Sequence, residues 1–187
     1  MSYKIPFAST TDWGAMRVGS GLSVTDGIVS ALGVPSDSYY GKFYSSTTQT
    51  NTGVNTAIPV SFPNTTLNNE VSTSGTSITF AKTGVYTITY EVQAEVTSGG
   101  GGNIDIWVRV NGSNLANSNS ITTIPGGGNR TIINRSFLVS LSAGDVVGVE
   151  WSSSVANMQL TALGTQINPS RPATNSANFL ATLVKAL

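Results

Sequence analysis

The side chains that most enzymes use for acid–base or nucleophilic chemistry are scarce in this chain. The 187 residues contain no His and no Cys, so the commonest general base and the thiolate nucleophile are both missing. Among the carboxylates, Glu91 and Glu95 share one face of an alternating run. Four residues along a strand separate them by roughly 13 Å, more than the roughly 5 to 9.5 Å between glycosidase carboxyl groups. We interpret them as a solvated face, predict no catalytic residue, and expect no enzyme.

Metal and phosphate sites are also not expected. Calcium needs six to eight converging oxygens, which the spacing of Asp105, Asp145 and Glu150 does not supply, and Asp145 falls in a turn where Asp is favoured for backbone reasons. The runs Gly99–Gly102 and Gly126–Gly128 do not continue into Lys-Ser or Lys-Thr, so they are interpreted as flexible loop tips rather than phosphate cradles. No cofactor is predicted.

The charge pattern excludes further classes of partner. Nine basic and nine acidic residues cancel, charged residues are only 10% of the chain, and the basic ones are scattered, so nucleic-acid binding is not expected. Residues 1–11 lack a basic segment followed by an apolar one, and no stretch approaches the ~18 apolar residues of a membrane span. We therefore expect neither secretion by a standard signal nor a membrane.

The elements that position these residues are predicted to be strands. Tyr86, Ile88 and Tyr90 alternate with polar residues in the run 85–96, and the run 104–110 alternates in the same way before an Asn111-Gly112 turn. Residues 133–141 and 147–151 are interpreted as a hairpin around 142–145, with Trp151 on the core side. Further strands are predicted at 42–48, 58–62, 77–80, 158–163 and 178–187. Short strands at such spacing favour an all-β sandwich or jelly roll.

The first part of the chain has a different organisation. Residues 16–29 contain one alternating hairpin around Thr25-Asp26-Gly27, which is too small to be stable alone in water. It needs a partner surface, either sister chains or another protein. The Gly33–Asp37 segment has linker composition. We therefore predict an N-terminal arm and hairpin over residues 1–37 and a head domain over residues 38–187.

Three motifs in the head occur in the order found in one superfamily. They are Gly84-Val85-Tyr86-Thr87-Ile88-Thr89-Tyr90, then Ile106-Trp107-Val108-Arg109-Val110-Asn111-Gly112, then Leu141-Ser142-Ala143-Gly144-Asp145-Val146-Val147. With an apolar last strand, they resemble the complement-type and tumour-necrosis-factor-like jelly rolls. The resemblance covers about residues 41–187. It implies a ten-strand jelly roll that forms a homotrimer, with the first and last strands near the three-fold axis, and it implies binding rather than catalysis.

The last strand and one tryptophan are the predicted trimer interface. Phe179, Leu183 and Leu187 form one face of the terminal strand, while its other face is also apolar, as expected of a strand buried on both sides. Trp107 lies on the face opposite Ile106 and Val108. It either fills a subunit interface or is an exposed contact residue, and the implied trimer favours the interface.

A second resemblance concerns the N-terminal hairpin. The run Trp13-Gly14-Ala15-Met16-Arg17-Val18-Gly19-Ser20-Gly21-Leu22-Ser23-Val24-Thr25-Asp26-Gly27-Ile28-Val29-Ser30 is similar to a short module of bacteriophage fibres and other virion proteins. It implies a virion structural protein made in the host cytoplasm and placed on the particle surface, as a capsid decoration (cement) or head-fibre protein. The partner would be the major capsid protein or another virion protein, contacted through Ile5, Phe7, Trp13, Met16 and Val18. The alternative is a tail or neck fibre tip that binds a host surface polysaccharide.

Overall fold

The computed structural model describes residues 22–25, 28–31 and 38–187. The chain divides into two units, Met1–Asp37 and Ser38–Leu187. In the first unit β1 (Leu22–Thr25) pairs antiparallel with β2 (Ile28–Ala31), as the alternating pattern predicts. The residues predicted to contact a capsid, Ile5, Phe7, Trp13, Met16 and Val18, lie outside the described residues, as does the linker segment 33–37.

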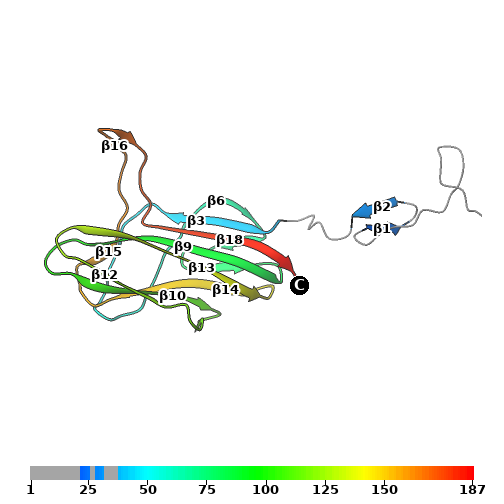
Figure 1. Cartoon of the computed structure of the whole chain (residues 1–187), viewed down its shortest axis with the longest axis horizontal. Helices are drawn as coiled ribbons and strands as arrows, with labels where there is room; N and C mark the ends of the chain where they lie inside the picture. The colour runs from blue at the N-terminus through cyan, green and yellow to red at the C-terminus, as the bar shows by residue number, and fades with distance from the viewer. Residues whose placement is uncertain (1–21, 26–27, 32–37) are drawn as a thin grey trace, which may run out of the picture. The chain divides into compact units, whose positions relative to one another are not determined.

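The head contains two seven-stranded antiparallel sheets, so the expected all-β sandwich is confirmed. The first sheet comprises β3 (Tyr40–Ser45), β4 (Gln49–Thr50), β6 (Asn64–Asn69), β9 (Gly84–Val96), β13 (Asn129–Leu141), β15 (Met158–Leu160) and β18 (Ala177–Ala186). The second comprises β5 (Ile58–Pro59), β7 (Val71–Thr73), β8 (Ile78–Phe80), β10 (Gly102–Val110), β11 (Ser113–Asn114), β12 (Ser120–Ile124) and β14 (Val146–Ser153). A separate ribbon, β16 (Gln166–Ile167) with β17 (Ser170–Arg171), stands out from the body (Figure 1).

The core lies between the two sheets and follows the predicted alternation. In β9 the side chains of Tyr86, Ile88 and Tyr90 are fully buried, while the residues between them face away from the core. The second sheet contributes the alternate residues of β10 and β14, including Trp151, whose predicted core position is confirmed by its complete burial. Apolar side chains with period two therefore form both inner faces of the sandwich.

The predicted hairpin between residues 133–141 and 147–151 is wrong. Strand β13 pairs with β9 in the first sheet, whereas β14 pairs with β10 in the second. The turn at Ser142–Asp145 therefore carries the chain from one sheet to the other. The alternating pattern identifies each strand and the turn between them, but it contains no information about which strand lies alongside.

The two glycine-rich segments meet at one end of the sandwich. A Cβ atom on Gly126 would overlap the backbone of Gly99 and Gly100, and one on Gly101 would overlap the Ile124 carbonyl oxygen and Pro125. Close approach of two loops therefore requires glycine here. The glycines have a packing role that the prediction of flexible loop tips did not include.

Two turns are joined by polar side chains near the start of β14. Asn111 and Gly112 have φ values of 50° and 77°, as expected of the predicted tight turn after β10. The Asn111 amide donates to Asp145 Oδ1 at 2.8 Å, and the Ser142 N–H donates to Asp145 Oδ2 at 2.7 Å. These two hydrogen bonds lower the pKa of the Asp145 carboxyl below its ordinary value, and the bond from Asn111 has the larger effect.

A second polar cluster joins three strands of the first sheet. The Glu95 carboxylate accepts hydrogen bonds from Arg130 at 2.8 Å, Thr161 at 2.5 Å and Gln159 at 3.2 Å. Burial would raise the pKa of Glu95, but the three hydrogen bonds and the Arg130 charge outweigh that effect and lower it. Glu91 and Glu95 were both predicted to be solvated. Glu91 is partly buried, and the prediction is wrong for Glu95, which is 6% exposed.

The Asp145 junction predicts a local loss of stability. Substituting Asp145→Ala removes the acceptor of the Asn111 and Ser142 donors, and we expect a loss of about 1–2 kcal/mol in the free energy of unfolding, measured in urea. Ser142→Ala is the matched control, because it leaves the backbone N–H in place. Equal stability of the two variants would contradict the role assigned to the carboxylate.

The Glu95 cluster predicts a pH-dependent contribution to stability. Because its folded-state pKa is lowered, ionised Glu95 stabilises the fold above its ordinary value of 4.5, and this contribution is lost as the pH falls through the lowered value. Glu95→Gln should cost about 1–3 kcal/mol at neutral pH, and the difference from the parent chain should shrink as the pH falls below 4.5. Glu70→Gln, at an exposed position between β6 and β7, is the control. A difference that stays constant with pH would argue against the cluster.

Candidate functional site

The outer face of the first sheet, the side turned away from the core, carries an unusual set of exposed apolar side chains. Five large aliphatic residues of this face, on β6, β13 and β18, are 44% to 68% exposed: Leu67, Ile132, Leu138, Leu180 and Val184. The paired strands place polar residues such as Lys42 and Thr89 between them, so the surface is mixed, as surfaces that contact another protein are. We refer to this surface as the apolar face.

The strand registers explain why these side chains point outward. Leu138 is paired with Thr87 and Leu180 with Thr89, and directly paired residues of neighbouring strands share one face of a sheet. Leu67 is paired with Lys42 in the same way. Since Tyr86 and Ile88 of β9 point into the core, their neighbours Thr87 and Thr89, and the residues paired with them, point out.

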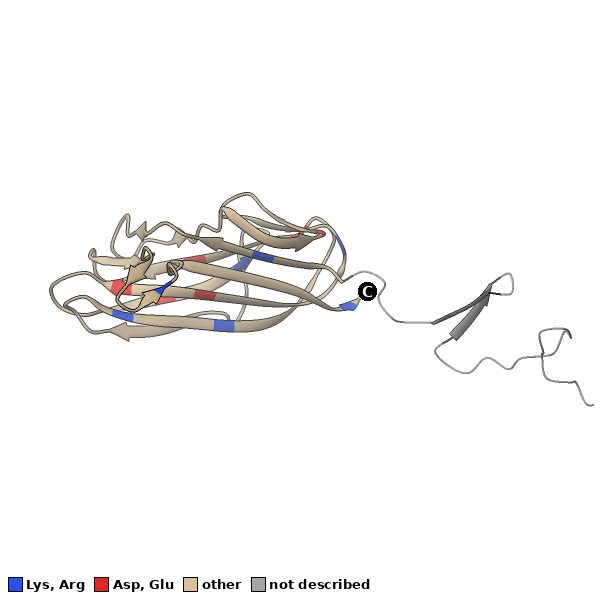
Figure 2. Cartoon of the chain, turned by 90° about the horizontal axis from the view of Figure 1, so that it is seen from above, with Lys and Arg blue, Asp and Glu red and all other residues tan. Residues whose placement is uncertain are grey.

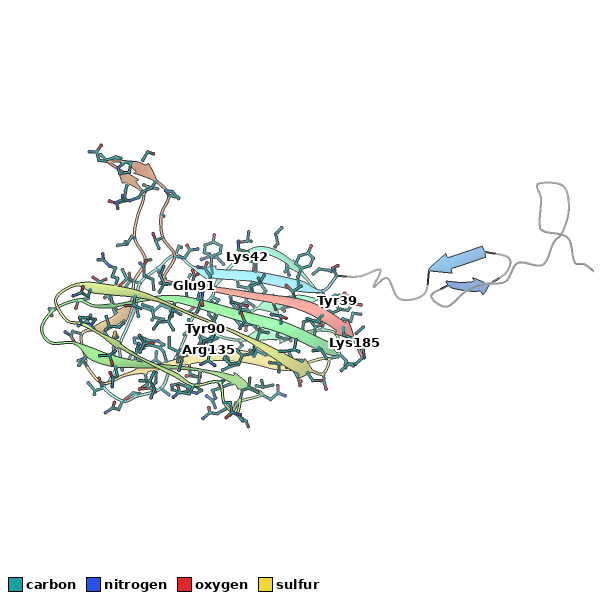
Figure 3. All side chains as sticks on the ribbon, in the orientation of Figure 1. Tyr39, Lys42, Tyr90, Glu91, Arg135 and Lys185 are labelled. Carbon is teal, nitrogen blue, oxygen red and sulfur yellow. The ribbon has the colours of Figure 1, made fainter. Side chains whose placement is uncertain are left out.

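A shallow hollow of about 310 Å³ lies within the apolar face. It is lined by Lys42, Thr89, Glu91, Asn178, Phe179 and Leu180. The Glu91 carboxylate accepts a hydrogen bond from the Asn178 amide at 3.1 Å. Within residues 38–187 the ion pairs are Arg109 with Glu150 and Arg130 with Glu95, so Lys42 and Glu91 are not in an ion pair there (Figure 3). Two opposite charges beside the exposed Leu180 side chain are suited to a protein partner that pairs with both.

The predicted interface residues of the last strand occupy three different environments. Phe179 is 1% exposed and its ring lies 5.6 Å from that of Phe62, so it is a core residue rather than an interface residue. Leu183 is partly buried and packs against the core, while Leu187 is 66% exposed. The outward residues of the strand are instead Leu180 and Val184. Both faces of this strand are apolar in sequence, and only the fold distinguishes them.

The sequence interpretation missed the contribution of β13 to the apolar face. Ile132 and Leu138 are exposed, whereas Ile133 and Val139, the next residues along, are buried. A strand with only one buried face needs apolar residues at every second position. Apolar residues at consecutive positions of β13 are therefore the signal that could have identified Ile132 and Leu138.

Trp107 lies on the other side of the sandwich. It projects from the outer face of β10 in the second sheet, where it is paired with Glu150 of β14. Its indole N–H donates to Asn114 Oδ1 at 3.0 Å. Trp107 and the outward residues of β18 therefore cannot belong to one continuous surface of a single subunit.

Charged residues are sparse along the ribbon of the head, and positions of both signs are interspersed in the view of Figure 2. Among the described residues no three Asp or Glu side chains gather as metal ligands would. In the same part of the chain, no helix has the length and apolar character needed to span a membrane. The two candidate surfaces are built mainly from apolar, aromatic and amide side chains.

Known proteins resemble this chain in fold but not in sequence. No family model matches the chain, and no curated protein matches it in sequence. Crystal structures of murine APRIL are similar in fold: the structure at pH 8.5 is 10% identical and that at pH 5.0 is 11% identical, each with a TM-score of 0.51. The similarity covers 79% and 81% of this chain and 100% of the APRIL chains. The head is therefore similar to tumour-necrosis-factor-like jelly rolls, as the strand motifs predict.

Proposed function

We propose that this chain is a structural protein of a bacteriophage virion, a non-enzymatic homotrimeric capsid decoration (cement) or head-fibre protein on the particle surface. Residues 1–37 attach to the major capsid protein or another virion protein, and the jelly-roll head projects outward. The observation that carries the viral role is the run Trp13–Ser30, which is similar to a module of phage fibre and virion proteins. A short hairpin in an N-terminal unit of its own supports an attachment role, because such a hairpin needs a partner surface.

The apolar face supports the homotrimer. Exposed Leu138 and Leu180 would lose their contact with water if a second copy covered them, at roughly 25 cal/mol for each Å² of apolar surface removed. Lys42 and Glu91 offer charges of both signs to the same partner. The last strand then lies beside the contact between subunits, as the family resemblance implies, although its residues at the contact are Leu180 and Val184.

A second candidate function is a tail or neck fibre tip that binds a host surface polysaccharide. The hollow beside Trp107 favours it, because a half-buried aromatic ring among amide side chains is suited to a sugar. Adsorption assays separate the two functions. Purified head from a fibre tip competes with phage for host cells, whereas a decoration protein does not.

The trimer predicts a mass in solution of three times the 19.4 kDa of one chain, measured by light scattering. Leu180→Asp or Leu138→Asp places a charge in the proposed contact, and each should shift the mass toward that of the monomer because an unpaired buried carboxylate is costly. Ile121→Asp is the matched control, since Ile121 is 65% exposed on the second sheet. A monomeric parent chain, or variants that all remain trimeric, would overturn this assignment.

Attachment through the N-terminal unit predicts the result of a deletion. Removing residues 1–12 takes away Ile5 and Phe7, and we expect binding to undecorated capsids to be abolished while mass and melting temperature of the head stay unchanged. The measurement is occupancy per particle after incubation of purified protein with shells. Occupancy equal to that of the full chain would refute the role of this arm.

A further inference from the structure

The second sheet carries a hollow of its own, on the side of the sandwich opposite the apolar face. This hollow, the Trp107 hollow, has a volume of about 310 Å³ and is lined by Trp107, Asn114, Leu115, Asn117, Ser118 and Asn119. Its size lies at the lower end of small-molecule sites, which occupy roughly 300–1,000 Å³. It is formed by the outer face of β10 and by the segment that connects β11 to β12.

The loop that forms the hollow is held by hydrogen bonds to the core strand. The buried Ser118 hydroxyl accepts from the Val108 N–H at 3.0 Å and lies 2.7 Å from the Leu115 carbonyl oxygen, to which it donates. The Leu115 N–H donates to the Val108 carbonyl oxygen at 2.8 Å, and the Leu115 side chain packs against the core. A loop fixed in this way presents its side chains in one arrangement, which lowers the entropic cost of binding.

The aromatic ring of Trp107 is positioned by a hydrogen bond at its edge. The indole N–H of Trp107 is satisfied by Asn114 at 3.0 Å, so the side chain needs no further hydrogen bond. The residue is half-buried and lines the hollow. Such a ring is suited to packing against a flat ligand that is apolar on its faces and polar at its edge.

The polar lining of the hollow is uncharged. Asn114, Asn117 and Asn119 contribute amides, each of which offers donors and acceptors, the combination that hydroxyl groups require. The nearest charges do not favour an anion. Asn119 donates to the Asp105 carboxylate at 3.0 Å, and Glu150, paired with Trp107 in the ladder, is neutralised by Arg109 at 3.2 Å.

A second hollow extends the same face beyond this ion pair. It has a volume of about 260 Å³ and is lined by Pro59, Thr76, Ser77, Arg109, Gly112, Val146, Gly148 and Glu150. Arg109 follows Trp107 on the outer face of β10, so both hollows border this one row of residues. Two residues along a strand span roughly 7 Å, so one extended ligand could reach both hollows.

From these observations we infer that the Trp107 hollow binds one sugar ring of an uncharged oligosaccharide, and that the neighbouring hollow takes the next part of the chain. Trp107 packs against the face of the ring, and the amides of Asn117 and Asn119 bind its hydroxyl groups. The inference assigns a ligand class to a site on the head and stands whether the protein decorates the capsid or forms a fibre tip.

The test uses the purified full chain on an array of uncharged hexasaccharides of glucose, mannose, galactose and N-acetylglucosamine, with sialylated and sulfated oligosaccharides beside them. We expect binding to at least one uncharged series and weaker binding to the anionic ones. Trp107→Ala should weaken that binding by on the order of tenfold or more, as truncation of a central aromatic contact does. Trp107→Phe should retain part of it, and Asn119→Ala should weaken it as well.

Controls separate loss of the site from loss of the fold. Ile121→Ala changes an exposed residue of the same sheet outside the hollow and should bind like the parent chain. Trp107→Ala should keep its mass in solution and its attachment to capsids, which distinguishes failure of the sugar site from failure of the proposed virion role. Absence of binding to every uncharged series, preference for the anionic ones, or undiminished binding by Trp107→Ala would overturn the inference. A change of mass in Trp107→Ala would instead return this residue to a subunit interface.

Discussion

Strand β9 is the element on which the rest of the head depends. It pairs with β13 along its whole length on one edge and with β18 and β15 on the other. Its inward residues, among them Tyr86 and Tyr90, are fully buried against the second sheet. The hydroxyl of Tyr86 donates to the Lys82 carbonyl oxygen at 2.9 Å, and that of Tyr90 lies 3.3 Å from the Ser120 hydroxyl. The strand can therefore carry large aromatic side chains in the core without leaving these hydroxyl groups unpaired.

Because the inner faces of both sheets are committed to the core, the two outer faces are free to differ. The first sheet turns Leu138 and Leu180 outward, whereas the second turns Trp107 and the Arg109–Glu150 pair outward. The contact proposed between copies uses the first of these faces, and the proposed sugar site uses the second. A subunit with this arrangement can be held in an assembly by one side while the opposite side stays accessible.

The sequence predicted strands well where alternation was strong and poorly where it was not. The runs around Tyr86 and Ile106 alternate clearly because one side meets a core and the other meets water. Strand β6 is missing from the prediction because Leu67 is its only large apolar residue and its backbone pairing needs no apolar side chains. Both faces of β18 carry apolar residues, so the sequence could not show that Leu180 points outward and Phe179 points into the core. The Trp107 hollow depends on a loop whose shape is set by Ser118, and no pattern of residue types indicates that contact.

The position of β18 has a consequence for the order in which the head can fold. This strand follows every other strand of the first sheet in the sequence, yet it lies between β9 and β3 in the middle of that sheet. The edges of β9 and β3 that face each other therefore stay unpaired until β18 is inserted between them, and pairing of segments so distant in sequence is slow because a long loop must close first. A change that prevents β18 from pairing would separate β3 and β6 from the rest of the sheet, whereas loss of an edge strand would only narrow it.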